Sequence, residues 1–157
     1  MGLDVGHFGP LWHIYKVGHL MDTDFDAIAR GHDVSVADFH MLSALMITSP
    51  QAMRATDLAY ALHVSNAVLS VRARRLASQG LLVRSASARD RRAVQLELTD
   101  AGRDKVKAVG TDLECQARFV RFYRRLPETD KAALERIMRD LHDYMDKAVI
   151  PVPRTID

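Results

Sequence analysis

Between residues 8 and 30, apolar side chains recur at spacings of three and four, which predicts a helix over that range. One stripe has the spacing of a core-facing side and consists of Leu11, Ile14, Gly18, Met21, Phe25 and Ile28. The adjacent stripe is mostly aromatic and consists of Phe8, Trp12, Tyr15 and His19. A helix that is apolar over so wide an arc has more to cover than one core, so we expect it to meet a partner chain or to line a cavity.

A shorter helix is predicted from about residue 36 to residue 48, where one side carries Phe39, Leu42, Leu45 and Met46. Ser35 lies directly before this helix and has the side chain of an N-cap. Thr56 precedes DLAYALHV in the same way, so we expect it to cap another short helix. His63 and Val64 then form a turn.

Ser65 is expected to cap a further helix, which runs to Gln79 and stops at Gly80. The next two segments, LLVRSAS and AVQLELT, alternate imperfectly between apolar and polar residues, and a polar, arginine-rich tip lies between them. This pattern predicts a β-hairpin, although the Asn-Gly signal of a tight turn is absent.

A long helix is predicted from Asp100 to about Arg124, and it is apolar on two opposite sides. One side carries Val106, Val109, Leu113, Ala117 and Val120, and the other carries Ala108, Thr111, Cys115, Phe119 and Phe122. A last amphipathic helix is expected from Glu128 to Ala148, after Pro127. Two opposite apolar sides are hard to bury in one small domain, so they indicate a subunit interface.

The composition is that of one ordinary globular domain over residues 1–157, with 48% hydrophobic and 27% charged residues. No apolar run approaches the ~20 residues of a membrane span. The N-terminal MGLDVGHFGPLWHIYK lacks the basic and apolar segments of a signal peptide, so we expect a cytoplasmic protein without membrane contact. A single cysteine excludes an internal disulfide framework and a cysteine-based zinc cluster.

The positive charge is concentrated in one segment. Residues 65–92 carry seven arginines and one acid, Asp90, which gives this segment a charge of +6. The whole chain is only +2, so the remainder sums to −4. A nearly neutral protein with one strongly positive segment has a specific polyanion-binding element, and we interpret it as a DNA-binding module.

The two helices around His63 have the pattern of a helix-turn-helix. Small residues at the start of the second helix allow its N-terminus to approach DNA closely, with phosphate near the backbone N–H groups and polar side chains at the base edges. Of three arginines one to two turns later, at most two are expected to reach the groove, and the arginine-rich hairpin tip is suited to the minor groove. The predicted DNA-binding residues are Ser65, Asn66, Ala67, Ser70, Arg72, Arg74, Arg75, Arg84, Arg89, Asp90, Arg91 and Arg92.

The order of these elements resembles that of the MarR-type winged helix-turn-helix regulators. The resemblance rests on DLAYAL (57–62), SNAVLSVRARRLASQGLL (65–82), ARDRRAVQLELTDAG (88–102) and LPETDKAAL (126–134), and it covers nearly the whole chain. It implies a mainly α fold with a β-hairpin wing, in which residues 36–99 bind DNA and residues 5–31 and 100–150 form a homodimer. It further implies a regulator, usually a repressor, that binds a pseudo-palindromic operator and is released by a small aromatic or phenolic ligand. By position, Asp90 and Arg92 match the wing-tip pair in which the acid orients the arginine that enters the minor groove.

Two positions depart from the family pattern. Many members have proline where this chain has Asn66, and arginine is common where this chain has Val71. Either change could alter the operator sequence. The family's usual ligand site lies between the dimer helices and the winged domain, which makes Trp12, Tyr15, His19 and His40 candidate ligand contacts. The alternative for these aromatic residues is ordinary packing in the dimer interface.

Other functions are weaker interpretations. The chain has no phosphate-binding glycine loop, no His-Glu-x-x-His and no nucleophile elbow, so no enzyme activity and no cofactor are predicted. A non-specific architectural DNA-binding protein would share the positive charge. Cys115 could be a redox switch, although its place in an apolar stripe favours a buried structural role. A composite metal site using His40 or His142 is a further alternative.

Overall fold

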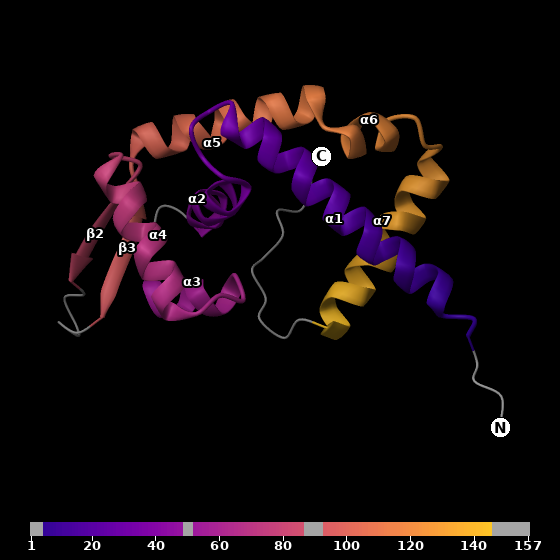
Figure 1. Ribbon diagram of the computed structural model, residues 1–157, viewed down its shortest axis with the longest axis horizontal. Helices are drawn as coiled ribbons and strands as arrows, with labels where there is room; N and C mark the ends of the chain where they lie inside the picture. The colour runs from indigo at the N-terminus through magenta and orange to yellow at the C-terminus, as the bar shows by residue number, and fades with distance from the viewer. Residues whose placement is uncertain (1–4, 49–51, 87–92, 146–157) are drawn as a thin grey trace.

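The computed structural model describes residues 5–48, 52–86 and 93–145 (Figure 1). Their elements, in order, are α1 (Phe8–Arg30), α2 (Val36–Thr48), β1 (Met53–Arg54), α3 (Ala55–Ala61), α4 (Asn66–Ser78), β2 (Leu82–Ala86), β3 (Val94–Leu98), α5 (Asp100–Gln116), α6 (Arg118–Tyr123) and α7 (Glu128–Met145). The predicted fold class, mainly helical with a small β-hairpin, is confirmed. The hairpin is part of a three-stranded antiparallel sheet in the order β1-β3-β2, because the short strand β1, which the sequence pattern did not reveal, also pairs with β3.

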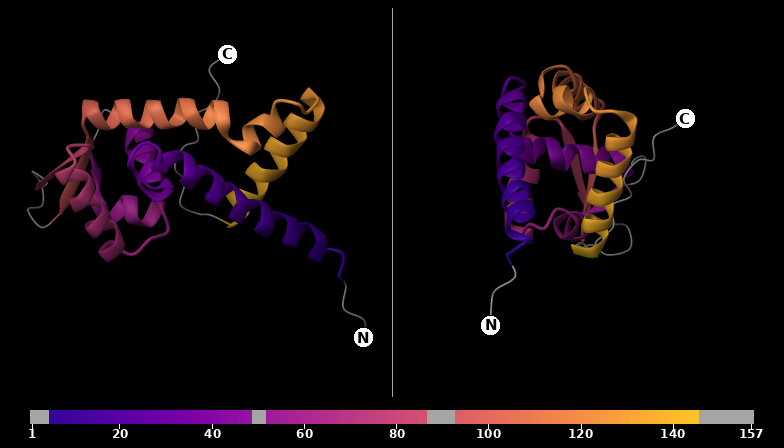
Figure 2. Two further views of the ribbon diagram at one scale, coloured as in Figure 1. Left: turned by 45° about the horizontal axis from the view of Figure 1, so that its top comes forward. Right: turned by 90° about the vertical axis from the view of Figure 1, so that its right-hand side faces the viewer.

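The hydrophobic core lies at one end of the chain, where α2, α3, α4 and the sheet gather beside α5 (Figure 1). Its fully buried large apolar side chains are Met41, Leu42, Leu58, Leu69, Leu76, Leu96 and Val109. At the other end, α6 and α7 continue from α5, and α7 contains no buried residue among those described. Figure 2 shows α1 and the α6–α7 pair extending away from the core end. No helix in the described ranges is both long and apolar enough to cross a membrane.

Helix α1 has the predicted length, but its predicted core-facing stripe is only half correct. Phe25 and Ile28 pack against the core, whereas Leu11 and Ile14 are 57% and 45% exposed. The first half of α1 extends beyond α2 and α5, the helices that cover its second half (Figure 1). Its apolar side chains are therefore left exposed by the other described elements.

The long helix predicted to reach Arg124 is interrupted at Ala117, which corrects that expectation. Ala117 is fully buried and has the extended backbone angles φ −62° and ψ 133°. Asp24 of α1 stabilises the new helix start, because its Oδ2 accepts a 2.8 Å hydrogen bond from the backbone N–H of Arg118. The interruption separates Phe119 and Phe122 from the apolar stripe on α5. Cys115, which we expected to be buried, is exposed.

Two of the three predicted helix caps are confirmed. The Ser35 hydroxyl accepts a 3.1 Å hydrogen bond from the N–H of Asp38, and the Ser65 hydroxyl accepts one of 3.2 Å from Val68. The prediction for Thr56 is wrong, because α3 begins at Ala55 and Thr56 lies inside the helix; the N-cap is Arg54, which makes no side-chain capping hydrogen bond. The strand β1 ends at Arg54, so the chain enters α3 directly from the sheet.

The start of α5 joins the wing to the rest of the fold. The Thr99 hydroxyl accepts a 3.0 Å hydrogen bond from the N–H of Gly102 and donates one of 2.7 Å to the carbonyl of Gly80, at the end of α4. Gly102 lies so close to the carbonyl oxygen of Leu81 that a Cβ atom would overlap it. Residues 98–102 therefore hold the first turn of α5 against the segment that links α4 to β2.

Candidate nucleic-acid interface

Helices α3 and α4 form a helix-turn-helix around His63, which has a left-handed φ of 50°. The turn is closed by a 3.0 Å hydrogen bond from the N–H of Val64 to the carbonyl of Ala59. Leu69 and Leu76 are buried and fix α4 to the core. Ser65, which caps α4, and the first residues of the helix are exposed. This N-terminus has the partial positive charge that favours phosphate.

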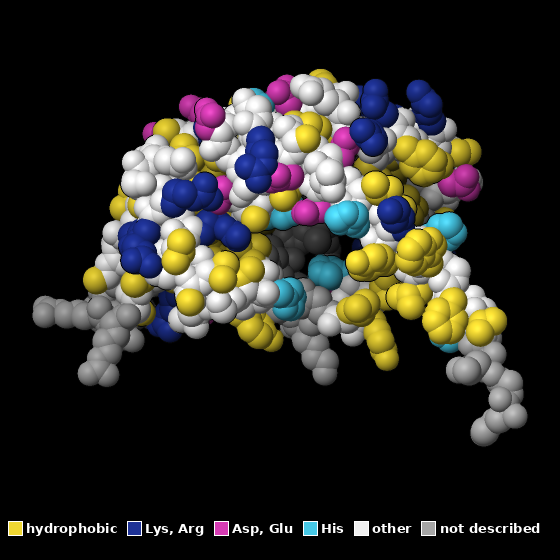
Figure 3. Space-filling view, in the orientation of Figure 1, with side chains coloured by type: hydrophobic (Ala, Val, Ile, Leu, Met, Phe, Trp, Pro, Cys, Tyr) yellow, Lys and Arg dark blue, Asp and Glu magenta, His cyan; other side chains and the backbone are white. Residues whose placement is uncertain are grey.

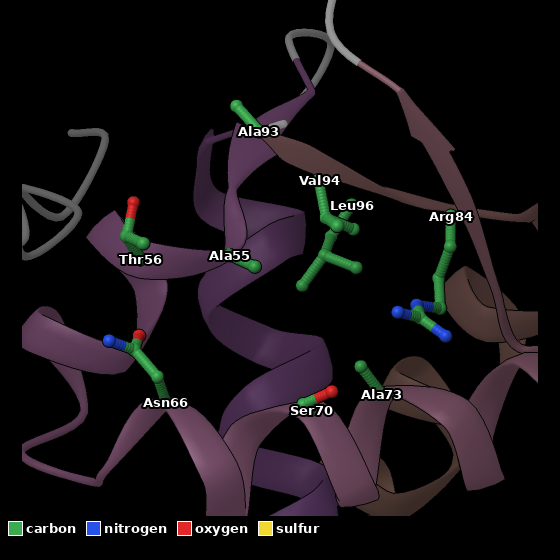
Figure 4. Close-up of a pocket in the computed structure, with 9 residues that line it drawn as sticks. All are labelled: Ala55, Thr56, Asn66, Ser70, Ala73, Arg84, Ala93, Val94 and Leu96. Atoms are coloured by element: carbon green, nitrogen blue, oxygen red, sulfur yellow. The ribbon is translucent and has the colours of Figure 1, made fainter. Parts of the chain in front are cut away.

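A hollow of about 310 Å³ lies between α4, the start of α3 and the wing strands (Figure 4). Its lining residues are Ala55, Thr56, Asn66, Ser70, Ala73, Arg84, Ala93, Val94 and Leu96. Figure 4 shows Asn66 and Ser70 on α4, with the Arg84 guanidinium extending from the wing toward the same space. The hollow thus brings together three of the predicted DNA-binding residues from two elements.

Two other predicted DNA-binding arginines are turned back onto the protein. Asp38 of α2 is fully buried, and its Oδ1 accepts a hydrogen bond from Nη2 of Arg75 and lies 3.6 Å from Nε of Arg72. The Arg72 side chain is only 20% exposed, while that of Arg75 is 49% exposed. Asp38 therefore connects α4, the second helix of the helix-turn-helix, to α2.

Hydrogen bonds keep the Asp38 carboxylate charged. Burial by itself would raise the pKa of Asp38, but the Ser35 hydroxyl, the Ser35 N–H and the Arg75 guanidinium all donate to the carboxylate, and the net pKa lies below its ordinary value. The sequence analysis missed Asp38. Its signal was the Ser35-x-x-Asp38 spacing, in which each residue's side chain bonds to the other's backbone N–H, as in a capping box.

The remaining arginines differ in how the structure places them. Arg74 is exposed and its Nε donates a 3.3 Å hydrogen bond to the carbonyl of Ser70, so it lies along the helix surface. Arg84 is exposed and forms no ion pair with a described acid. Arg89, Asp90, Arg91 and Arg92 lie outside the described residues. In Figure 3, basic and apolar side chains lie next to each other over the end of the molecule that contains α3, α4 and β2.

The candidate ligand contacts come from two helices. Trp12 and Tyr15 of α1 are 61% and 69% exposed, with ring centroids 6.5 Å apart, and His19 lies on the same exposed half of the helix. His40 lies on α2. Desolvation of its ring lowers the pKa of His40, the charge of Asp22 on α1 raises it, and the charge of Arg72 on α4 lowers it further, with a net decrease. His40 is thus electrostatically coupled to both α1 and the recognition helix.

The metal alternative gains no support from the described part of the chain, where no three His, Cys, Asp or Glu side chains gather as a metal site would require. Histidines do gather beside a hollow in the middle of the face shown in Figure 3. The position of His32 is explained without a metal, because its Nε2 lies 2.8 Å from Oδ2 of Asp112 on α5.

In comparisons with known proteins, this chain is similar to transcriptional regulators. Residues 32–93 match the family model described as MarR family. The HTH-type transcriptional regulator PecS of Dickeya dadantii (strain 3937) is 31% identical over 101 residues, which cover 64% of this chain and 61% of the length of PecS. The structure of AbsC, a MarR family transcriptional regulator from Streptomyces coelicolor, superposes with a TM-score of 0.76 at 21% identity, covering 92% of this chain and 97% of AbsC. The transcriptional repressor CouR, solved bound to a 23-mer DNA duplex, superposes with a TM-score of 0.73 at 21% identity, covering 90% of this chain and 99% of CouR.

Proposed function

We propose that this chain is a MarR-type winged helix-turn-helix regulator that binds a pseudo-palindromic DNA operator as a homodimer. In this proposal the protein represses transcription in the cytoplasm until a small aromatic or phenolic ligand releases it from the DNA. The family is one of transcription regulators and not of enzymes. Residues 36–99 would bind DNA, and residues 5–31 and 100–150 would form the dimer.

The observation that carries DNA binding is the placement of α4. The helix is fixed by Leu69 and Leu76 on its core side and by the Asp38 contacts at its flank, while its N-terminal face is exposed beside Arg84. A rigid helix with an open N-terminus and a flanking cation suits the major groove. We therefore assign Asn66, Ser70 and Arg74 to the groove or its edges, and Arg84 to a phosphate.

A homodimer would cover the two ends of the chain that the core does not reach. The apolar side chains that α1 and α7 leave at least 40% exposed are Phe8, Leu11, Trp12, Ile14, Tyr15, Val17, Leu20, Ile137, Met138, Tyr144 and Met145. Monomeric proteins rarely leave so large a set of neighbouring apolar residues in water. Dimerisation would also place two copies of α4 at successive turns of the DNA, about 34–36 Å apart.

Release by a ligand requires a connection between the sensor and the recognition helix. His40, whose pKa is lowered mainly by desolvation of its ring, lies on α2 two residues after Asp38, which contacts Arg75 of α4. A ligand that contacts His40 and the aromatic rings of α1 would therefore act on the helix that carries Asp38. It would shift the equilibrium only by the difference between its affinities for the DNA-binding and non-binding arrangements.

The test is fluorescence anisotropy with labelled DNA from the region beside the protein's own gene, in the presence of excess random-sequence competitor. Binding is expected to survive the competitor and to be relieved by one member of a panel of aromatic carboxylates and phenols. Arg84→Ala is expected to weaken binding about equally for all DNA sequences and to reduce the slope of log affinity against log salt concentration by about 1, because it removes one phosphate contact. The control Arg121→Ala removes the same charge from an exposed position on α6, at the other end of the molecule, and should leave the affinity unchanged.

A non-specific architectural protein is the competing function, since it would share the +6 charge of residues 65–92. Most of the affinity of such a protein would come from phosphate contacts, which every DNA sequence offers. Random-sequence competitor would therefore displace the labelled DNA in proportion to the competitor concentration. Loss of binding in that manner, from every DNA fragment tried, would overturn the proposal of a specific regulator.

A further inference from the structure

The centre of the exposed face of α4 is apolar, which is unusual for a surface that meets DNA. Val71 is 60% exposed and Val68 is 46% exposed, and Ala67 beside them is also exposed. At 100° per residue, Val71 points almost directly away from the direction of the buried Leu69, Ala73 and Leu76. Val71 therefore lies near the centre of the outward side of the helix.

The surrounding polar groups point elsewhere. Arg72 and Arg75 turn toward Asp38 on one flank, and Ser70 turns toward the hollow on the other flank (Figure 4). Arg74 follows the helix surface back to the carbonyl of Ser70. These polar side chains thus border Val71 and leave it 60% exposed.

The chemistry of a DNA groove offers one good partner for such a residue. The C5-methyl group of thymine is the apolar feature of the major groove, and it contacts small apolar side chains such as alanine or the methyl of threonine. Valine has two methyl groups held stiffly by its branched Cβ, so little side-chain entropy is lost when it packs against another methyl.

We propose that Val71, with Ala67 one turn earlier, reads thymine by contact with its C5-methyl group, so that each half-site of the operator carries a thymine at a fixed position. The inference rests on the proposed function, since it concerns the same DNA surface. It makes Val71 a specificity-determining residue at the position where the sequence departs from the family's common arginine.

The experiment first selects the preferred sequence from a randomised DNA duplex and then replaces its thymines one at a time by uracil, which removes only the methyl group. For the wild-type protein, one replacement per half-site is expected to weaken binding about three- to fivefold, the contribution of one buried methyl group. Val71→Ala should bind the thymine duplex more weakly and should distinguish thymine from uracil at that position less than the wild type does, because only one of the three methyl and methine carbons beyond Cα remains.

Two variants serve as controls. Val83→Ala makes the same change at a 52% exposed position of β2, on the sheet face away from α4, and should keep the full preference for thymine. Val71→Thr retains one methyl group and should keep most of it. The melting temperature of Val71→Ala should equal that of the wild type, because the side chain is exposed.

The outcomes separate this inference from the proposed function. If no sequence is enriched from the random duplex, the specific regulator itself is excluded. If a sequence is enriched but no uracil replacement weakens binding, the proposed thymine contact is excluded while the proposed function is kept. The same conclusion follows if uracil replacement weakens binding equally for Val71→Ala and the wild type.

Discussion

Asp38 of α2 is the buried residue that contacts α4, the second helix of the helix-turn-helix. It is the one fully buried charged side chain among the described residues, and it accepts hydrogen bonds from Ser35 and Arg75 with Arg72 close by. A buried charge is tolerated only when its hydrogen-bonding capacity is used, and removing one partner leaves the others unpaired. Its partners lie on α4 and directly before α2, so a substitution of Asp38 would weaken the contact between α2 and the helix-turn-helix.

Asp38→Asn is therefore expected to lower the free energy of unfolding by about 1–3 kcal/mol, since the neutral amide loses the charge-assisted bonds to Arg75 and Ser35. The Arg75 side chain is 49% exposed, so water screens part of the loss. Urea denaturation measures the change. The control Asp104→Asn alters an exposed carboxylate on α5 and should leave stability within a few tenths of a kcal/mol.

The same change predicts a difference in acid stability. The pKa of Asp38 is lower in the folded protein than the ordinary 3.8, so its contribution is complete above that value and is lost as the pH falls through the lower folded pKa. Below pH 4, the wild type should thus lose stability more steeply than Asp38→Asn. Parallel curves for the two proteins would show that Asp38 does not titrate as its contacts require.

At the scale of elements, the position of the wing depends on how closely the first turn of α5 approaches the chain after α4. A Cβ at Gly102 would overlap the carbonyl of Leu81 and lie 2.8 Å from Cδ1 of Leu98, whereas a Cβ at Gly110 on the same helix meets nothing within 4 Å. The two glycines share a helical backbone and differ in their surroundings, which makes them a matched pair.

Gly102→Ala is expected to destabilise the protein by about 1–3 kcal/mol because backbone or Leu98 must move to admit the methyl group. Gly110→Ala should be neutral or stabilise by up to ~1 kcal/mol, because alanine is the better helix former and the site is open. Thermal denaturation of both variants tests the comparison. Equal effects would mean that the close approach of α5 to Leu81 does not limit the fold.

At the scale of the whole molecule, the described residues divide into an end that contains the hydrophobic core and an end where α7 has no buried residue. The described part of α7 has no buried residue, and its apolar side includes Ile137 at 52% and Met138 at 43% exposure. Hydrophobic stabilisation scales with the area removed from water, so the described residues of α7 gain little of it from the rest of the described chain.

A second copy of this chain is the partner that the proposed function requires. Ile137→Glu is expected to shift the protein from dimer to monomer at micromolar concentration, since it places a charge in an apolar interface. Light scattering coupled to size exclusion reads the mass directly. The control Ile47→Glu makes the same change at a 43% exposed position of α2 and should remain dimeric. A wild-type monomer would contradict the dimer.

The sequence by itself determined the elements whose causes are local. The caps Ser35 and Ser65, the glycine after α4 and the alternation along the wing strands each depend on residues a few positions apart, so the helix-turn-helix and the hairpin could be predicted from spacing and residue type. Several candidate DNA-binding residues were also identified in this way, because positive charge and small residues at a helix start are visible in the chain order.

Only the tertiary structure decided features that depend on residues far apart in the chain. The helix break at Ala117 depends on Asp24, and the inward turn of Arg72 and Arg75 depends on Asp38. The exposure of the first half of α1 depends on where α2 and α5 end. Periodicity states which residues share a side of a helix, but the partner that covers that side is set by packing and long-range ion pairs, which the order of residues does not encode locally.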